Sequence, residues 1–187
     1  NSFEIKKFKI IYTGTLALKH NPEIITNIAI KNKDIDILIV GAGSGFQKLK
    51  NMKNMPSNIK MLPLQPFKKM SDILNSADVL LGILSNDASK FSVPSKILNY
   101  LCAGKPIILS APKDNLAATI ISESKSGKTF EPQDLNGLNN FLKILMTDSV
   151  IRKKYSLNAR NYAENNFKIE KISLKFENII NNLNINK

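Results

Sequence analysis

The sequence predicts an α/β protein built on an open, doubly wound parallel sheet of the Rossmann-like kind. Short apolar runs rich in β-branched residues alternate with stretches of helical periodicity, and each run stops at Gly, Pro or Ser. The runs are continuously apolar, as expected for strands that helices cover on both faces. Strand–helix alternation with right-handed crossovers gives an open doubly wound sheet, and such a sheet binds its ligands in the loops that follow the strands.

Five of these runs predict strands, at residues 8–13, 35–40, 59–62, 79–84 and 106–109. Helices are expected between them, near residues 22–31, 45–53, 67–76, 94–103 and 115–123. The ligand-binding loops are therefore expected at residues 14–20, 41–46, 63–67, 85–96 and 110–115.

The last third of the chain is predicted to be helical apart from one short strand. Residues 127–130 are expected to form the edge of the sheet, and Asp134 opens the first of three helices. The third, at residues 168–186, is amphipathic, with lysines opposite its apolar side, and therefore needs a surface to cover it. No repeat or low-complexity linker interrupts residues 1–187, so we expect these residues to form a single domain.

Length and charge narrow the possible functions. The chain has 187 residues and a net charge of +12, and its two halves contribute equally. Nearly all the basic residues are Lys, whereas nucleic-acid readers favour Arg gathered on one face. We therefore interpret the charge mainly as a composition effect and expect no nucleic-acid partner. Part of it would attract an anionic membrane or a phosphorylated ligand.

The single cysteine and the lack of a long apolar stretch bear on the compartment. Cys102 lies in an apolar helical run and is expected to be a reduced core thiol. No stretch approaches the roughly 20 apolar residues that span a bilayer. We expect a cytoplasmic protein.

The first loop combines features of a phosphate site. Gly14 follows the first strand, and Lys19 and His20 stand just before a helix. A glycine lets backbone N–H groups approach a phosphate, and a lysine adds positive potential. His20, the only histidine, is more typical of a surface loop than of a catalytic base.

The second loop, Gly41-Ala42-Gly43-Ser44-Gly45-Phe46, is glycine-rich but is not a dinucleotide fingerprint. The pattern G-x-G-x-x-G requires glycine where Phe46 stands. The loop therefore indicates a ligand-contacting turn and argues against NAD.

The fourth loop opens the most informative helix. Ser92 or Pro94 is expected to start it, so that Ser95 and Lys96 occupy the first turn and Asn99 lies one turn further on. N–H groups and a cation at a helix start both favour an anion. This arrangement suits a diphosphate and its ribose.

Five blocks in this order resemble the C-terminal half of retaining glycosyltransferases of the GT-B fold, family 4, group 1, which are common in bacterial capsule and O-antigen assembly. The blocks are Tyr12-Thr13-Gly14 with Lys19, Val40-Gly41-Ala42-Gly43, Leu62-Pro63-Leu64-Gln65-Pro66, Ser76-Ala77-Asp78-Val79-Leu80-Leu81, and Val93-Pro94-Ser95-Lys96 through Gly104-Lys105-Pro106-Ile107-Ile108. The resemblance implies a nucleotide-sugar-binding domain whose N-terminal acceptor domain is absent from this chain, so that the fragment alone is inactive.

The resemblance also implies roles for individual residues. It gives catalytic roles at the diphosphate to Lys19 and Lys96. It gives donor binding to Gly14 in the first loop, Gly41 and Gly43 in the nucleotide floor, Leu64 and Gln65 at the nucleobase, Ser95 at the diphosphate and Asn99 at the ribose. Asn99 is a departure, since the family usually has a glutamate there, and Phe91 stands where a second glutamate is usual.

The expected function is retaining transfer of a sugar from a nucleoside diphosphate to a growing or lipid-linked glycan. Because no Asp-rich motif is present, we expect no metal or other cofactor. The implied partners are the donor, the missing acceptor domain, and an anionic membrane surface at the inner face of the plasma membrane. Two alternatives stay open. One is an inactive sugar-nucleotide-binding module, which Asn99 favours. The other is a nucleotide-sugar epimerase, which would rely on carboxylates and histidines.

Overall fold

A six-stranded parallel sheet forms the centre of the protein, as the sequence predicts. The computed structural model describes residues 7–85 and 90–184. The strands lie in the order β3-β2-β1-β4-β5-β6. Their bounds are Phe8–Thr15 (β1), Ile35–Ala42 (β2), Ile59–Leu62 (β3), Val79–Ile83 (β4), Ile107–Ser110 (β5) and Gly127–Phe130 (β6). The chain winds outward from β1 in both directions, so the strand order reverses between β1 and β4.

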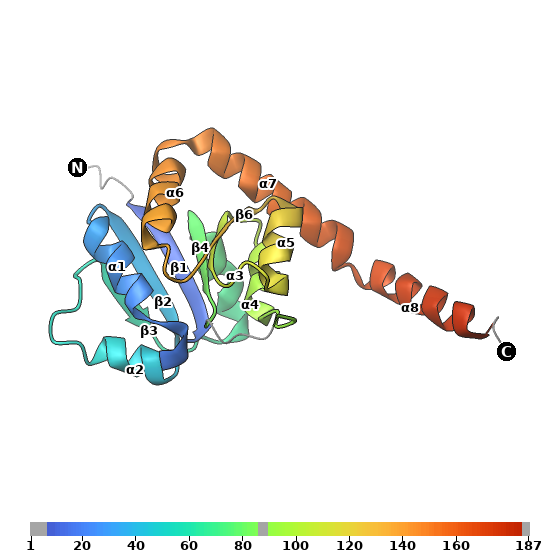
Figure 1. Cartoon of the computed structure of the whole chain (residues 1–187), viewed down its shortest axis with the longest axis horizontal. Helices are drawn as coiled ribbons and strands as arrows, with labels where there is room; N and C mark the ends of the chain where they lie inside the picture. Colours follow the sequence, from blue (N-terminus) through green and yellow to red (C-terminus); the bar gives the residue numbers. More distant parts are fainter. Residues whose placement is uncertain (1–6, 86–89, 185–187) are drawn as a thin grey trace.

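Helices cover both faces of the sheet (Figure 1). On one face the apolar core includes side chains of α1 (Glu23–Lys31), α2 (Ser44–Lys50) and α6 (Leu135–Thr147). On the other it includes side chains of α3 (Phe67–Asn75), α4 (Ser95–Cys102), α5 (Leu116–Ser124) and α7 (Ser149–Asn166). A short 3-10 turn, η1 (Leu18–His20), precedes α1. Successive residues of β1 divide between the two cores, as the two-residue period of a strand requires.

Local signals in the sequence set several helix ends. The side chains of Asn115, Asp134 and Asp148 accept hydrogen bonds from backbone N–H groups in the first turns of α5, α6 and α7. Gly104 follows α4 in the left-handed conformation, with φ of +61°, which ends that helix. The predicted helix at Asp134 and the predicted edge strand at 127–130 are both confirmed.

The structure corrects three expectations. Strands β1 and β2 each run two residues further than predicted, because their pairing continues through Gly14 opposite Gly41 to Thr15 opposite Ala42. Of the two expected starts of α4, Ser92 is wrong, whereas Pro94 is confirmed, because it immediately precedes the first helical residue, Ser95. Part of the loop expected at residues 85–96 lies outside the described residues.

The third correction concerns Cys102, which was expected to be a core thiol. Its side chain is exposed and is not part of the core. Ile97, Tyr100 and Leu101 form the buried face of α4. The residue that follows Leu101 is rotated by about 100° around the helix axis and so faces outward.

Helix α8 (Ile169–Asn184) extends away from the rest of the domain (Figure 1). Most of its large apolar side chains are exposed, namely Ile169, Leu174, Phe176, Ile179 and Ile180. The amphipathic helix is confirmed within the described residues, and in this chain its apolar side faces solvent.

The two central strands separate where the functional loops begin. Their pairing joins only Ile10 with Val79 and Ile11 with Leu80. Beyond that point the hydroxyl of Tyr100, from α4, lies between the strands. It accepts from the Thr13 N–H at 2.9 Å and donates to the Leu81 carbonyl at 3.3 Å. A continued parallel ladder would join these two groups directly. The Tyr100 hydroxyl replaces the direct bond between the Thr13 N–H and the Leu81 carbonyl, and the two strands stay separated on either side of it.

Candidate functional site

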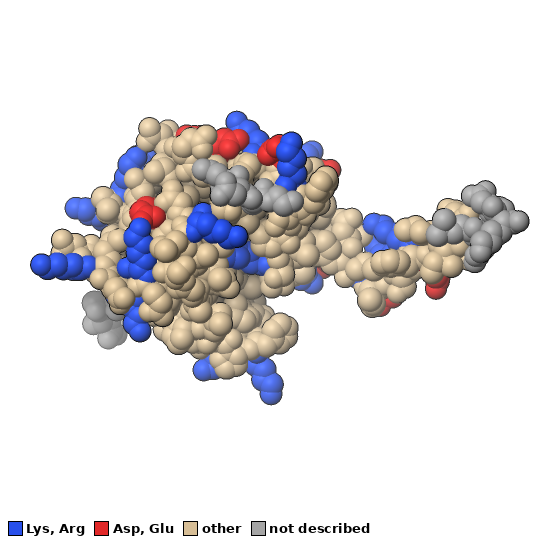
Figure 2. All heavy atoms as spheres, turned by 60° about the horizontal axis from the view of Figure 1, so that its bottom comes forward, with Lys and Arg blue, Asp and Glu red and all other residues tan. Residues whose placement is uncertain are grey.

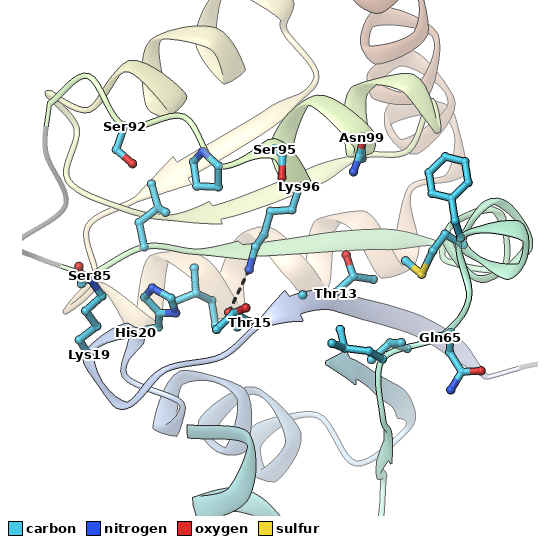
Figure 3. A pocket seen from close by; sticks show the side chains of 18 residues that line it. Thr13, Thr15, Lys19, His20, Gln65, Ser85, Ser92, Ser95, Lys96 and Asn99 are labelled. Atoms are coloured by element: carbon cyan, nitrogen blue, oxygen red, sulfur yellow. Dashed lines mark hydrogen bonds between the residues drawn. The ribbon is translucent and has the colours of Figure 1, made fainter. Parts of the chain in front are cut away.

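A cavity of about 690 Å³ opens at the C-terminal ends of β1 and β4. Seven of the nine predicted site residues line it: Gly14, Lys19, Leu64, Gln65, Ser95, Lys96 and Asn99. They come from the end of β1, η1, the loop after β3 and the start of α4, which face one another across the cavity (Figure 3). Such a position, at the reversal of strand order, is where doubly wound sheets bind ligands.

Lys96 places a cation in this cavity. Its Nζ donates to the hydroxyl of Tyr12 at 2.7 Å and lies 4.0 Å from the centre of the Tyr12 ring. The Thr15 carbonyl oxygen is 3.5 Å away (Figure 3). Burial lowers the pKa of the Lys96 ammonium to about 8. In the part of the chain that the structure describes, no carboxylate pairs with it. The ammonium therefore keeps its charge available to a ligand near neutral pH.

The backbone at the end of β1 lies beneath the Lys96 side chain. Gly14 has a φ of +97°, which favours glycine over any residue with a Cβ. A Cβ added at Gly14 would lie 3.6 Å from Cε of Lys96. The backbone turn and the lysine stem therefore lie against each other at the cavity floor.

His20 also lines the cavity, within the ligand-binding loop predicted at residues 14–20. It is half-buried rather than a free surface side chain, and its Nδ1 accepts from the Ala17 N–H at 3.2 Å. Burial, and then the charges of Lys96 and Lys19, lower the pKa of its imidazole. The ring is therefore neutral at pH 7, and its Nε2 carries the proton. The sequence placed His20 in a predicted ligand-binding loop but favoured a surface side chain over a residue of the site.

Gly41 and Gly43 do not line this cavity. The structure places them beneath the first loop, where the chain after β1 crosses over them. A methyl group at Gly41 would lie 2.1 Å from the Gly14 carbonyl oxygen, and one at Gly43 would lie 2.6 Å from the Leu16 carbonyl oxygen. Gly41 instead lines a neighbouring hollow of about 590 Å³, together with Leu64. These glycines allow two backbone segments to touch.

The start of α2 is used in the same contact. The N–H groups of Gly45 and Phe46 donate to the Leu16 carbonyl at 2.9 and 3.1 Å, and the Ser44 hydroxyl accepts from the Leu18 N–H at 3.1 Å. These donors are the ones that a fingerprint turn would offer to a pyrophosphate. Here they fix the first loop, and Lys19 with it.

The start of α4 differs from the start of α2. Pro94 precedes the helix, and no side chain caps it in the described structure. Its first turn, which contains Ser95, therefore retains N–H groups and the positive end of the helix dipole for a ligand. Ser92 lines the cavity without capping the helix.

A second hollow joins the cavity at Asn99. It has a volume of about 590 Å³ and lies between α3, α4 and α7. Thr13, Phe67, Met70 and Asn99 line both spaces. Met70 is a site residue that the sequence interpretation took as an ordinary helix position, whereas Phe67, which is 92% exposed, ends the ligand-binding loop predicted at residues 63–67. The two spaces therefore meet at these four residues.

The loop after β3 borders this junction. The Gln65 side chain turns back on its own loop, where Nε2 donates to the Pro63 carbonyl at 3.0 Å. Leu64 is exposed. A ligand group here would therefore meet main chain and apolar surface. Within residues 7–85 and 90–184, no three His, Cys, Asp or Glu side chains lie together as a metal site.

Comparison with known proteins gives a family match over most of the chain. The family model for glycosyl transferases group 1 matches residues 1–162. A protein of Escherichia coli K12 named as a colanic acid biosynthesis glycosyl transferase, WcaI, is 24% identical over 176 residues. The match covers 91% of this chain but 42% of WcaI, so the chain spans less than half of that relative.

Solved structures share the fold. Sucrose-phosphate synthase from Thermosynechococcus elongatus matches with a TM-score of 0.78 and 16% identity, over 97% of this chain and 47% of that one. HepE from Anabaena, solved in complex with UDP-glucose, matches with a TM-score of 0.75 and 15% identity, over 95% of this chain and 49% of that one. The six-stranded sheet and its helices are thus those of GT-B glycosyltransferase domains.

The contact between the glycine-rich turn and the first loop gives a stability prediction. Gly41→Ala should lower the free energy of unfolding by about 2 kcal/mol, because the added methyl group displaces the Gly14 backbone. Urea unfolding measures this. Thr15→Ala, an exposed change in the same loop, should alter it by less than about 0.5 kcal/mol. Equal stability of the two variants would contradict the contact.

Proposed function

The chain belongs to the glycosyl transferases group 1 family, and we propose that its cavity binds the nucleoside diphosphate sugar donor of a retaining glycosyltransferase. The observation that carries the proposal is the Lys96 ammonium, which lies in the cavity beside the uncapped start of α4 with no carboxylate paired to it among the described residues. A cation and helix N–H groups together suit a diphosphate. HepE, which has the same fold, was solved with UDP-glucose, and this supports the ligand class.

We assign the parts of the donor to this cavity, up to its junction with the second hollow at Asn99. The diphosphate lies between Gly14 and the first turn of α4, with Lys19 at its edge. Asn99, at the junction, accepts from a ribose hydroxyl through its amide oxygen. The nucleobase then meets the main chain at Leu64 and Gln65. An amide forms a weaker bond than the glutamate usual in this family, by about 1 kcal/mol.

The chemistry follows from where charge develops. The bond between the anomeric carbon and the diphosphate oxygen breaks, so the sugar becomes oxocarbenium-like and the nucleoside diphosphate gains negative charge. Lys96, Lys19 and the N–H groups at the start of α4 stabilise that charge. We propose that these groups suffice without a metal ion. The acceptor hydroxyl then attacks the same face of the sugar and passes its proton to the departing diphosphate oxygen, so that the configuration is retained.

The alternatives are less well supported by the cavity. No Asp or Glu lies among its described lining residues, and His20 is the only histidine. An epimerase needs acids and bases at the sugar ring, which these walls do not offer. An inactive binding module would keep the same donor site, so turnover by the whole protein separates it from an enzyme.

The acceptor belongs to the rest of the protein. This chain spans 42% of WcaI and 49% of HepE. We propose that an N-terminal domain supplies the acceptor site, and that the acceptor is a growing or lipid-linked glycan of a capsule, O-antigen or similar polysaccharide. The name of WcaI, which refers to colanic acid biosynthesis, supports a bacterial polysaccharide. We propose that the apolar side of α8 docks on this domain, because it is otherwise exposed to water.

The surface and the helices bear on membrane contact. None of the helices in the described residues is long and apolar enough to cross a bilayer. Basic side chains are scattered over the face seen in Figure 2, with few acidic ones among them. A net charge of +12 would favour approach to an anionic cytoplasmic membrane surface, where lipid-linked acceptors lie.

The donor site predicts nucleoside diphosphate binding that depends on Lys96. UDP, GDP and ADP are titrated into this chain by calorimetry and thermal shift, and the tightest, at 100 times its Kd, should stabilise the fold by about 2.7 kcal/mol. Lys96→Met should weaken binding by about tenfold or more, since a charge-assisted bond is lost. In the whole enzyme, Lys96→Ala should lower transfer by roughly 10²-fold.

Controls separate this effect from general charge. Lys33→Met removes an exposed lysine just before β2, at the opposite end of the sheet, and should leave the affinity unchanged. Because the Lys96 pKa is about 8, wild-type affinity should fall as pH rises from 7 to 9, whereas Lys96→Arg should remove that fall. Full affinity in Lys96→Met, or no binding of any of the three, would refute the donor site.

Docking of α8 predicts a difference in amide hydrogen exchange. Amides of α8 should exchange at least about tenfold more slowly in the whole protein than in this chain, because packing stabilises the helix. Amides of α7, which already packs on the domain, serve as the matched control. Unchanged exchange in the whole protein, or protection only on adding anionic phosphatidylglycerol vesicles, would show that α8 does not dock on the other domain.

A further inference from the structure

Tyr12 connects the core of the domain to the cavity. Its ring is fully buried on β1, yet its hydroxyl reaches the end of the strand and meets two groups there. It donates to the Thr15 carbonyl at 2.6 Å. A phenol has one proton, and burial raises the Tyr12 pKa, so that proton stays in place. The hydroxyl oxygen must therefore accept from Lys96, whose Nζ is 2.7 Å away.

The contact orients a cation without neutralising it. Lys96 has three N–H donors on a flexible four-carbon stem. One is held by Tyr12, the ring below attracts the charge, and a second points toward the Thr15 carbonyl at 3.5 Å. A carboxylate in the place of the phenol would fix the ammonium equally well but would cancel its charge. At least one donor and the full charge remain available to the cavity.

We propose that Tyr12 is a positioning residue, whose phenol holds the Lys96 ammonium in place for the diphosphate of the donor before the donor binds. The inference rests on the proposed function, since it concerns the same site. A lysine that is already ordered loses less freedom when it binds. Electrostatic stabilisation of a leaving group is also greatest when the donor is fixed in advance.

Tyr12→Phe isolates the hydroxyl. Phenylalanine keeps the buried ring, its packing and its attraction for the cation. The Thr15 carbonyl loses one donor, but Thr15 is exposed, so water can replace the hydroxyl. The variant should therefore fold, and circular dichroism and thermal unfolding verify that it does. Tyr162→Phe, a hydroxyl deletion on α7 where the ring packs against Phe167, is the matched control.

A double-mutant cycle tests the proposal on this chain. Wild type, Tyr12→Phe, Lys96→Met and the double variant are titrated with UDP, GDP and ADP, and the tightest of the three is used throughout. Tyr12→Phe should weaken binding by about tenfold in the wild-type background and by less than about twofold in the Lys96→Met background. Tyr162→Phe should leave binding unchanged in both.

The pH dependence of binding is the second readout. The titratable groups facing Lys96 in the described structure are Tyr12 on β1 and Lys19 and His20 on η1. His20 is neutral by pH 7, so the fall in affinity above that pH follows Lys96. In Tyr12→Phe the midpoint of the fall should move to lower pH, because the ammonium loses an acceptor that stabilises its charge.

The outcomes distinguish this proposal from the one on which it rests. Equal weakening by Tyr12→Phe in both backgrounds, no weakening in either, or an unmoved pH midpoint would leave Tyr12 with a role in the fold alone. Unchanged affinity in Lys96→Met would instead refute the donor site, and the positioning role with it. Weakening of binding by Tyr12→Phe only when Lys96 is present, together with a pH midpoint that moves lower, supports both proposals.

Discussion

The site depends on the hydroxyl of Tyr100 between the two central strands. By accepting from Thr13 and donating to Leu81, it satisfies both backbone groups that the separated strands would otherwise leave unpaired in the core. Without such a relay, an opening at this depth would cost the desolvation of a buried donor and a buried acceptor. The crevice between β1 and β4 is therefore a stable part of the fold.

The same contact sets the two walls of the cavity. Tyr100 fixes α4 across β1, and Lys96, one turn earlier on the same helix face, then reaches Tyr12. On the other side, the glycine-rich turn after β2 holds the loop after β1 through close backbone contacts. One wall thus carries a helix start and a cation, and the other carries Lys19 and a glycine backbone.

The sequence predicted the sheet, its helices and most of the cavity lining, because strand runs and helix caps are local signals. The predicted ends of β1 and β2 were wrong because hydrogen bonding between the two strands extends them. Gly14 and Gly41 were interpreted as the stops of these strands, yet the pairing continues through both. Long-range contacts were not predictable, since Tyr12 lies 84 residues from Lys96 and Thr13 lies 87 from Tyr100. The glycine-rich turn indicated a ligand, whereas its N–H groups hold the first loop. A glycine-rich turn suits contact with another backbone segment as well as contact with a phosphate, so the sequence alone does not distinguish the two.

We expect a nucleoside diphosphate to lie in the crevice between β1 and β4 beside Tyr100, with its phosphates between Gly14 and the start of α4. Amide chemical-shift mapping by NMR, with UDP titrated into the ¹⁵N-labelled chain, tests this most directly. The largest shifts should occur at Gly14, Ser95 and Lys96 and should saturate together. Largest shifts around the hollow that Lys113 and Lys128 line beside β6 would contradict this placement.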